Sequence, residues 1–474
     1  MKISLNNIKY KYEIFQIFSL FYNQDEIEFS DIGEFKINII KNNIIMGNNI
    51  IKEYSFDEDL TEKENIKKYV YSYLVDTFGY GFPYGTLVGI RPSKIASKLL
   101  KEGFNESEII KYYDKYYLAS SEKAKLCTEV AENEKKLLNN DSHKVSIYVG
   151  MPFCPTRCIY CSFASNPISS VKHLVQPYLE ALTKEIEYIG KLIKERNIEI
   201  DCVYFGGGTP TSVDEESFDK IMRVIYDNFV CEKNIREFTV ECGRADSINF
   251  KKLNTMKKFN VDRISINPQS MNNRTLKMIG RSHTKEDVVN IFNMARKLCF
   301  ENINMDIIIG LADEGINEIK NTMDEIEKLN PDSITIHGLS IKRGSKLKDS
   351  DNKQAARGFD EICNMYQEAH ARSKKIGMFP YYMYRQKNMI GNMENTGYCM
   401  TSKEGIYNME MIEDSESILA FGADGVSKYV DTKTGRIDRT ANVKDVKEYI
   451  NRIDEMITRK VQLFFKEELQ WQNH

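Results

Sequence analysis

Long apolar runs, a strong charge imbalance and dense cysteine are all missing from this 474-residue sequence. The 66 basic and 69 acidic residues give a net charge of −3, so no overall field attracts nucleic acid, and an anionic substrate must be met by local cations. No stretch is apolar over the roughly 20 residues that cross a bilayer. The first residues lack the apolar segment and cleavage site of a secretory signal, so we expect a cytoplasmic protein without a membrane span. Ten cysteines are too sparse for a disulfide framework.

Three of these cysteines nevertheless lie close together, at Cys154, Cys158 and Cys161. They follow the β-type run 145–149, and the prolines beside them disfavour helix, so we expect the thiols on a loop that leaves a strand. A zinc site would bring a second Cys or His pair, but the next cysteine, Cys202, lies in an apolar run typical of a buried strand. A cubane [4Fe–4S] cluster normally takes four thiolates, so a trio leaves one iron open to a small molecule. The trio therefore predicts a catalytic cluster.

A glycine-rich segment follows at residues 201–211, Asp-Cys-Val-Tyr-Phe-Gly-Gly-Gly-Thr-Pro-Thr. An apolar strand ends there in three glycines, which let backbone N–H groups approach a polar ligand without side chains in the way. The spacing is neither G-x-G-x-x-G nor a Walker loop, so a dinucleotide-binding fold or a phosphate-cradling NTPase is poorly supported.

Three sections follow from the pattern of the chain: an α+β domain over residues 1–142, a central section over 143–345 and a substrate-side section over 346–474. The first combines β-type runs such as 35–40 and 43–46 with helical patterns at 63–78, 93–101, 106–113 and 120–138. The central section predicts strands at 146–149, 203–205, 238–241, 263–267, 304–309 and 333–337, with helices at 176–196, 214–229, 285–298 and 316–329. Six β-then-α units predict a parallel sheet curled into a partial (β/α)6 barrel with ligands at the carboxyl ends of its strands.

Polar residues recur at these predicted strand ends, namely Glu241, Gln269, Arg281 and Asp306. Asp306 is flanked by apolar residues on a central strand, so we expect it to hydrogen-bond a ribose, whereas Arg281 can pair with a carboxylate. His283 and His337 can move protons, but each also fits a satisfied structural histidine.

The spacing Cys-x3-Cys-x2-Cys with Tyr160 before the third cysteine resembles the signature of the radical S-adenosylmethionine (SAM) superfamily. Together with the glycine segment and residues 263–270 and 304–311, it is similar to the oxygen-independent coproporphyrinogen III oxidase family. Residues 89–94 and 384–398 resemble the HemZ-type branch of that family.

This resemblance implies oxidative decarboxylation of two propionates of coproporphyrinogen III, giving protoporphyrinogen IX in haem biosynthesis. It implies a [4Fe–4S] cluster, one or two SAM molecules, and an electron donor such as flavodoxin or ferredoxin. The resemblance assigns the cluster to Cys154, Cys158 and Cys161, and catalytic positions to Tyr148 and Glu241. The residues that it assigns to SAM are Tyr148, Tyr160, Gly207, Gly208, Thr209, Glu241, Gln269, Arg281, Asp306 and Ser340.

Two positions depart from the family pattern, since Gly150 and Phe163 stand where histidine and cysteine are usual. A haem-binding chaperone and a haem-opening radical SAM methyltransferase therefore stay open as alternative functions. For the anionic tetrapyrrole we expect Arg385 and Lys387, within the aromatic segment 381–389, to bind propionates. Alternatively, that segment belongs to the core and its edge.

Overall fold

The computed structural model describes residues 1–474 except 49, 139–143, 341–357, 388, 432–433 and 466–474. The chain forms two compact units, Met1–Glu132 with Tyr384–Glu394, and Asn133–Met383 with Asn395–His474. The predicted domain boundaries at residues 142 and 345 lie outside the described residues, so the division at those points stays a prediction.

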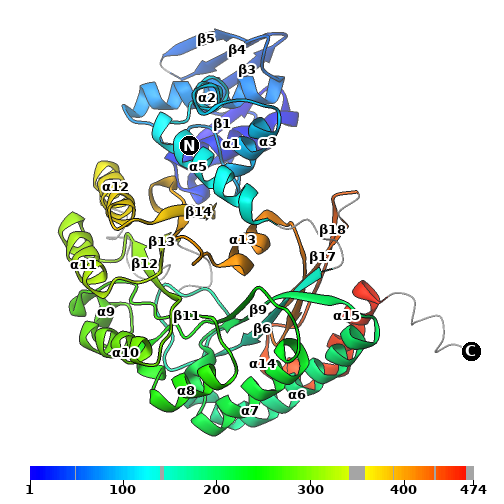
Figure 1. Cartoon of the computed structure of the whole chain (residues 1–474). Helices are drawn as coiled ribbons and strands as arrows, with labels where there is room; N and C mark the ends of the chain where they lie inside the picture. The colour runs from blue at the N-terminus through cyan, green and yellow to red at the C-terminus, as the bar shows by residue number, and fades with distance from the viewer. Residues whose placement is uncertain (49, 139–143, 341–357, 388, 432–433, 466–474) are drawn as a thin grey trace, which may run out of the picture. The chain divides into compact units, whose positions relative to one another are not determined.

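The first unit contains a five-stranded sheet in the order β2–β1–β3–β4–β5 (Figure 1). Its strands are β1 (Lys2–Leu5), β2 (Glu28–Phe29), β3 (Phe35–Ile40), β4 (Asn43–Gly47) and β5 (Ile51–Ser55). In β3, buried residues alternate with exposed ones because successive side chains of a strand point to opposite faces. The buried face joins apolar residues of α1 (Lys11–Phe21) and α2 (Glu62–Phe78) in one core.

Three further helices follow, α3 (Ser93–Lys101), α4 (Glu106–Tyr117) and α5 (Ser121–Leu137). Asn105 caps helix α4, because its side chain accepts from the Glu108 backbone N–H while the Glu108 carboxylate accepts from the Asn105 backbone N–H. This reciprocal cap satisfies two donors that the first helical turn leaves unpaired. The strands and helices predicted for this part of the chain are thereby confirmed within a few residues.

The second unit is built on an 11-stranded sheet in the order β14–β15–β13–β12–β11–β10–β9–β6–β16–β17–β18. Its centre is parallel throughout and consists of β6 (Lys144–Met151), β9 (Glu199–Gly207), β10 (Glu237–Val240), β11 (Arg263–Ser265), β12 (Ile303–Ile309) and β13 (Ser333–Gly338). These are the six predicted strands, and their chain order is also their order in space. The α/β prediction with a partial (β/α)6 barrel is confirmed.

Strands from the last part of the chain extend this sheet at both edges. Strand β15 (Asn395–Cys399) pairs antiparallel with β13, and β14 (Phe379–Tyr384) lies beyond it. At the other edge β16 (Ser417–Phe421) pairs parallel with β6, followed by the antiparallel strands β17 (Val426–Asp431) and β18 (Arg436–Ala441). The C-terminal extension therefore continues the central sheet.

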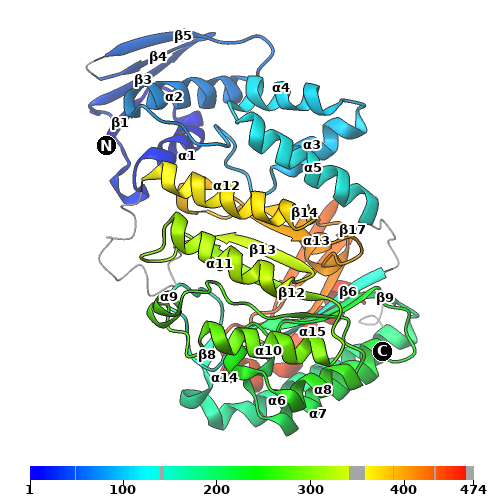
Figure 2. The same ribbon diagram turned by 60° about the vertical axis from the view of Figure 1, so that its left-hand side comes forward.

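Helices of the second unit form an outer layer along the parallel strands (Figures 1 and 2). The layer includes α6 (Ile168–Glu195), α7 (Glu215–Ile225), α8 (Phe250–Lys258), α10 (Lys285–Lys297) and α11 (Ile316–Leu329). The remaining helices are α9 (Asn273–Met278), α12 (Phe359–Lys375), α13 (Ile406–Glu413), α14 (Val446–Asn451) and α15 (Ile453–Phe464). None of the helices in the described part of the chain is long and apolar enough to span a membrane.

Candidate active site

The cysteine loop leaves the carboxyl end of β6, as predicted. The short strand β7 (Phe153–Cys154) pairs with β8 (Asn166–Pro167), which closes the loop that carries all three cysteines. Cys154 and Cys158 are each 7% exposed, and Cys161 is half-buried. Each sulfur accepts a hydrogen bond from a different side chain: Thr209 Oγ1 at 3.4 Å for Cys154, Arg244 Nη1 at 3.8 Å for Cys158 and Ser165 Oγ at 3.8 Å for Cys161.

The spacing of these sulfurs fits a cluster better than a single ion. The three Sγ atoms do not all lie within 4.8 Å of one another, whereas ligands of one metal ion share a tighter shell. Burial raises the pKa of the Cys154 thiol to about 11, although the Thr209 hydrogen bond opposes that rise. A thiolate at this position therefore needs positive charge nearby, which iron supplies. We conclude that the loop fits three irons of a cubane cluster.

The glycine segment packs directly against the cysteine loop. Gly207 has a φ of 101°, a conformation open mainly to glycine, and a Cβ on Gly208 would lie 2.9 Å from Cys154 Sγ. The Gly208 and Thr209 N–H groups donate to the carbonyls of Met151 and Phe153, at 2.6 and 2.8 Å. The prediction that backbone N–H groups of the glycine segment face a ligand is therefore wrong for Gly208 and Thr209. Their N–H groups hold the cysteine strand instead.

Glu241 lies just after β10 and accepts three hydrogen bonds. The donors are the hydroxyls of Tyr204 and Ser265 and, at 2.9 Å, the amide nitrogen of Asn267. These contacts come from β9 and from β11 or its end, the two strands that flank β10, so they fix the carboxylate where the strands end.

Tyr148, Tyr204 and Tyr407 form a stacked aromatic group beside this carboxylate. Their ring centroids are 6.3 Å apart for Tyr148 and Tyr204, and 4.6 Å for Tyr204 and Tyr407. Burial and the Glu241 charge raise the pKa of Tyr148, so its hydroxyl stays protonated at neutral pH. Tyr407 comes from α13, far away in the sequence, and was not predicted.

Asp306 lies on β12 and pairs with His337 of β13, with 3.5 Å between Oδ2 and Nε2. The Asn304 amide donates to the other carboxylate oxygen at 2.7 Å. Burial alone would raise the Asp306 pKa, but the hydrogen bond and charge of His337 lower it below its ordinary value. Burial would lower the His337 pKa, but the hydrogen bond and charge of Asp306 raise it above its ordinary value, so the pair favours a charged Asp306 beside a protonated histidine.

Arg281 and Gln269 hold positions beside the same strand ends. Arg281 Nη1 donates to the carbonyls of Asn267 and Gly243, while Nη2 donates to the Tyr160 hydroxyl at 3.1 Å. Gln269 has a positive φ of 66°, and its buried Oε1 has no hydrogen-bond partner in the described part of the chain. Arg281 Nε is likewise buried without a partner there. Buried polar atoms without partners are rare, so these two suit a bound polar ligand.

Three predicted site residues remain, Ser340, Arg385 and Lys387. Ser340 is half-buried just beyond the end of β13. Arg385 and Lys387 belong to the first unit, unlike every other predicted site residue. Arg385 is 3% exposed, donates to the carbonyls of Leu87, Asn392 and Met393, and lies 4.4 Å from the Tyr84 ring centroid. These contacts hold a local fold and do not support a substrate-binding role for Arg385, whereas Lys387 is exposed.

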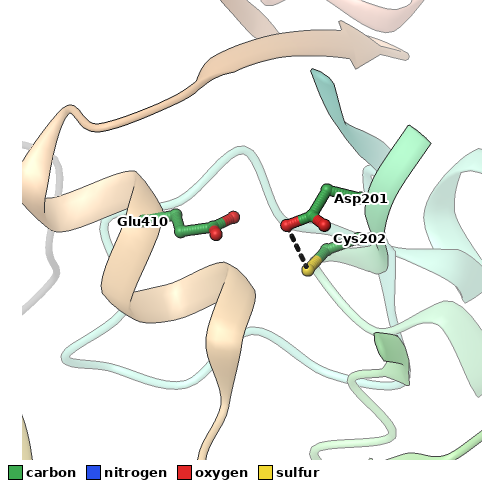
Figure 3. A group of neighbouring side chains, drawn as sticks. All are labelled: Asp201, Cys202 and Glu410. Atoms are coloured by element: carbon green, nitrogen blue, oxygen red, sulfur yellow. Dashed lines mark hydrogen bonds between the residues drawn. The ribbon is translucent and has the colours of Figure 1, made fainter. Parts of the chain in front are cut away.

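A separate group in the second unit, Asp201, Cys202 and Glu410, has ligand atoms that all lie within 4.8 Å of one another (Figure 3). Arg236 fills the role of its cation, since one Nη2 contacts both Asp201 and Glu410. Burial and neighbouring Glu410 raise the pKa of Glu416 to about 10, so that carboxyl is protonated and adds no charge. The group is a buried ion-pair network, and we do not assign it a metal.

Comparisons with known proteins agree with this arrangement. The model of the radical SAM superfamily matches residues 148–326. The oxygen-independent coproporphyrinogen-III oxidase-like protein HemZ of Bacillus subtilis is 40% identical over 416 residues, which cover 86% of this chain and 83% of that protein. The heme chaperone HemW of the same organism is 28% identical over 65% of this chain and 76% of its own length. The structure of coproporphyrinogen III oxidase (HemN) from Escherichia coli matches with a TM-score of 0.52 at 18% identity, over 81% of this chain and 78% of that one, which shows a shared fold.

The superfamily match covers the strands that carry the cysteine loop, the glycine segment and the polar strand ends. Members of the superfamily use a [4Fe–4S] cluster and SAM, and the three cysteines and the unsatisfied polar atoms fit these two groups. The HemZ similarity extends over most of both chains. The chain therefore belongs to the oxygen-independent coproporphyrinogen III oxidase-like family, HemZ type, within the radical SAM superfamily.

Proposed function

We propose that this protein is a cytoplasmic radical SAM oxidoreductase that decarboxylates two propionates of coproporphyrinogen III to vinyl groups. The observation that carries the proposal is the meeting of three cysteines, a glycine segment and fixed charged groups at the carboxyl ends of one parallel sheet. Strand ends of this kind are where barrel enzymes place their chemistry. Similarity to HemZ along most of the chain supports the tetrapyrrole as substrate.

In this proposal Cys154, Cys158 and Cys161 hold the cluster. Bound SAM and the cluster supply a radical able to remove hydrogen from an unactivated carbon, chemistry beyond side-chain acids and bases. The chain's own residues bind, orient and exclude water.

Charged and amide groups at the strand ends orient SAM in the proposed site. Asp306 accepts from a ribose hydroxyl, and Gln269 Oε1, which has no partner among the described residues, accepts from a donor of the ligand. Arg281 keeps Tyr160 in place through the hydroxyl contact. Tyr148 offers a protonated hydroxyl and a flat face beside Glu241, and Ser340 adds a further polar contact.

The partners proposed with this function are a tetrapyrrole and an electron donor such as flavodoxin or ferredoxin. Four propionates require cations, and Lys387 is retained as one proposed contact because it is exposed. Arg385 is not retained, because its donors already bind carbonyls of its own unit.

A haem chaperone is the second candidate, and the similarity to HemW favours it. Gly150 also stands where the family usually has a histidine. A Cβ at Gly150 would lie 3.2 Å from the Phe421 carbonyl oxygen and 3.3 Å from the Tyr148 ring, so the close packing at that position suits glycine.

Anaerobic turnover separates the two candidates. Reconstituted protein is incubated with coproporphyrinogen III, SAM and a reductant, and the tetrapyrrole is analysed by mass spectrometry. We expect stepwise loss of carbon dioxide and two hydrogens per propionate, one hydrogen atom being recovered in 5′-deoxyadenosine and the other leaving as a proton and an electron, and neither product from Cys158→Ala. Tight haem binding with no decarboxylation by the wild-type protein would favour the chaperone.

A further inference from the structure

Arg244 is a buried arginine that contacts the cysteine loop at three points. It is 3% exposed and follows β10 by four residues. Its Nη1 lies 3.8 Å from Cys158 Sγ and also donates to the Thr156 carbonyl at 3.0 Å and the Thr156 hydroxyl at 2.8 Å. One guanidinium nitrogen is thus directed at the loop and at one sulfur in particular.

Asp246 holds the other side of the same guanidinium. Nε donates to Oδ1 at 2.9 Å and Nη2 donates to Oδ2 at 2.7 Å, a two-pronged pair. His283 contacts Asp246 in turn, with 3.4 Å from Nδ1 to Oδ1. Because both the position and the rotation of the guanidinium are fixed, Nη1 cannot turn away from the sulfur without breaking this pair.

A cation fixed beside a cluster sulfur affects the charge state of the cluster. Reduction adds one negative charge, and hydrogen bonds to the sulfurs together with nearby charge set the reduction potential. The effect is larger in a buried site because water screens less of the charge there.

We propose that Arg244 raises the reduction potential of the [4Fe–4S] cluster through Cys158, and that Asp246 is the positioning residue that keeps it there. The inference rests on the proposed assignment of Cys158 as a cluster ligand. Arg281 also interacts with Cys158, but its terminal nitrogens are engaged by the Asn267 and Gly243 carbonyls and the Tyr160 hydroxyl.

The test is a potentiometric titration of the reconstituted full chain without SAM, followed by electron paramagnetic resonance. We expect Arg244→Gln to retain iron and sulfide. At a fixed ambient potential its ratio of reduced to oxidised cluster should fall about tenfold, which corresponds to ~59 mV for one electron. Arg244→Lys keeps the charge but loses the two-pronged pair, so its potential should lie between those of Arg244→Gln and the wild type.

A matched control removes the same charge from the protein surface. Arg223 on α7 pairs with Asp219 and its side chain is 55% exposed, so Arg223→Gln should leave the potential at the wild-type value. An unchanged potential in iron-replete Arg244→Gln would overturn the proposal, as would an equal shift in the control.

Loss of iron from both Arg244 variants would also overturn it, because Arg244 would then hold the loop and not tune the cluster. The assignment of Cys158 as a cluster ligand is tested by a separate variant. It is wrong if Cys158→Ala still assembles the intact cluster.

Discussion

At the scale of single residues, Gly208 lies at the tightest point of the proposed site. A Cβ there would approach the Phe153 carbonyl oxygen to 2.7 Å and Cys154 Sγ to 2.9 Å, both shorter than normal contacts. We therefore expect Gly208→Ala to displace Cys154 and weaken cluster retention about 10- to 100-fold, the range seen when groups that orient metal ligands are lost. Iron retained after incubation with a chelator measures this. Gly358→Ala, where a Cβ meets open space, is the control and should retain iron normally.

The Asp306–His337 pair gives a residue-scale prediction for pH. The His337 pKa is raised above 6.5, so its contribution to stability is complete below pH 6.5 and is lost as pH rises through the raised value. The Asp306 pKa is lowered below 3.8, so its contribution is present above that value and is lost only in stronger acid.

The pair should therefore stabilise the protein most between about pH 4 and 6.5. We expect His337→Gln to lower the free energy of unfolding by about 1 kcal/mol at pH 5.5, with a smaller difference at pH 9. Thermal unfolding across that range measures it, with exposed His173→Gln as control. A deficit that does not change with pH would contradict the pairing.

At the scale of elements, strands β14 and β15 depend on one glycine. A Cβ on Gly397 of β15 would lie 1.9 Å from a ring carbon of Tyr382 on β14, too close for any side chain. Gly397→Ala should reduce the free energy of unfolding by about 1–3 kcal/mol, the usual cost of overpacking. Chemical denaturation measures the change, and Gly89→Ala, with nothing near its Cβ, is the control. Adding Tyr382→Leu should recover part of the loss, and no recovery would mean that the ring is not the obstacle.

Local patterns predicted the elements that carry the site. Short apolar runs alternating with helical patterns located the six parallel strands. The edge strands β15 and β16 were not predicted, because their pairing depends on partners far away in the sequence and no local signal specifies it.

Dependence on distant parts of the chain also explains why the sequence did not point to Arg244 and Asp246 and why it misplaced Arg385. Arg244 and Asp246 stand four residues or more beyond a strand, and only the fold directs them to Cys158. Their position after Glu241, at a strand end with other polar residues, was the available signal. Arg385 was expected at the substrate because it lies among aromatics, but burial turns its guanidinium toward carbonyl groups.

At the scale of the whole molecule, a buried network ties the last helix to the sheet of the second unit. Lys460 of α15 and Glu185 of α6 pair at 2.6 Å, and both are almost fully buried. Tyr449, Asn442 and the Gly422 N–H also donate to the Glu185 carboxylate.

Removing only the cation leaves a buried, uncompensated charge. Lys460→Met should therefore cost about 3–5 kcal/mol of unfolding free energy. The double variant Glu185→Gln with Lys460→Met should be more stable than the single variant, because glutamine keeps an acceptor without the charge. Denaturant unfolding of both variants measures this, and additive losses would contradict the pairing.

The pairing of β16 with β6 has a consequence for the order of assembly during synthesis. Strand β6 leaves the ribosome roughly 270 residues before β16, an interval of about 15–50 s at 5–20 residues/s. During that time one edge of the strand that leads into the cysteine loop has its backbone groups unpaired, and such an edge can recruit another chain. A chaperone or an iron donor that acts on the nascent polypeptide would therefore meet β6 while its β16 edge is still unpaired.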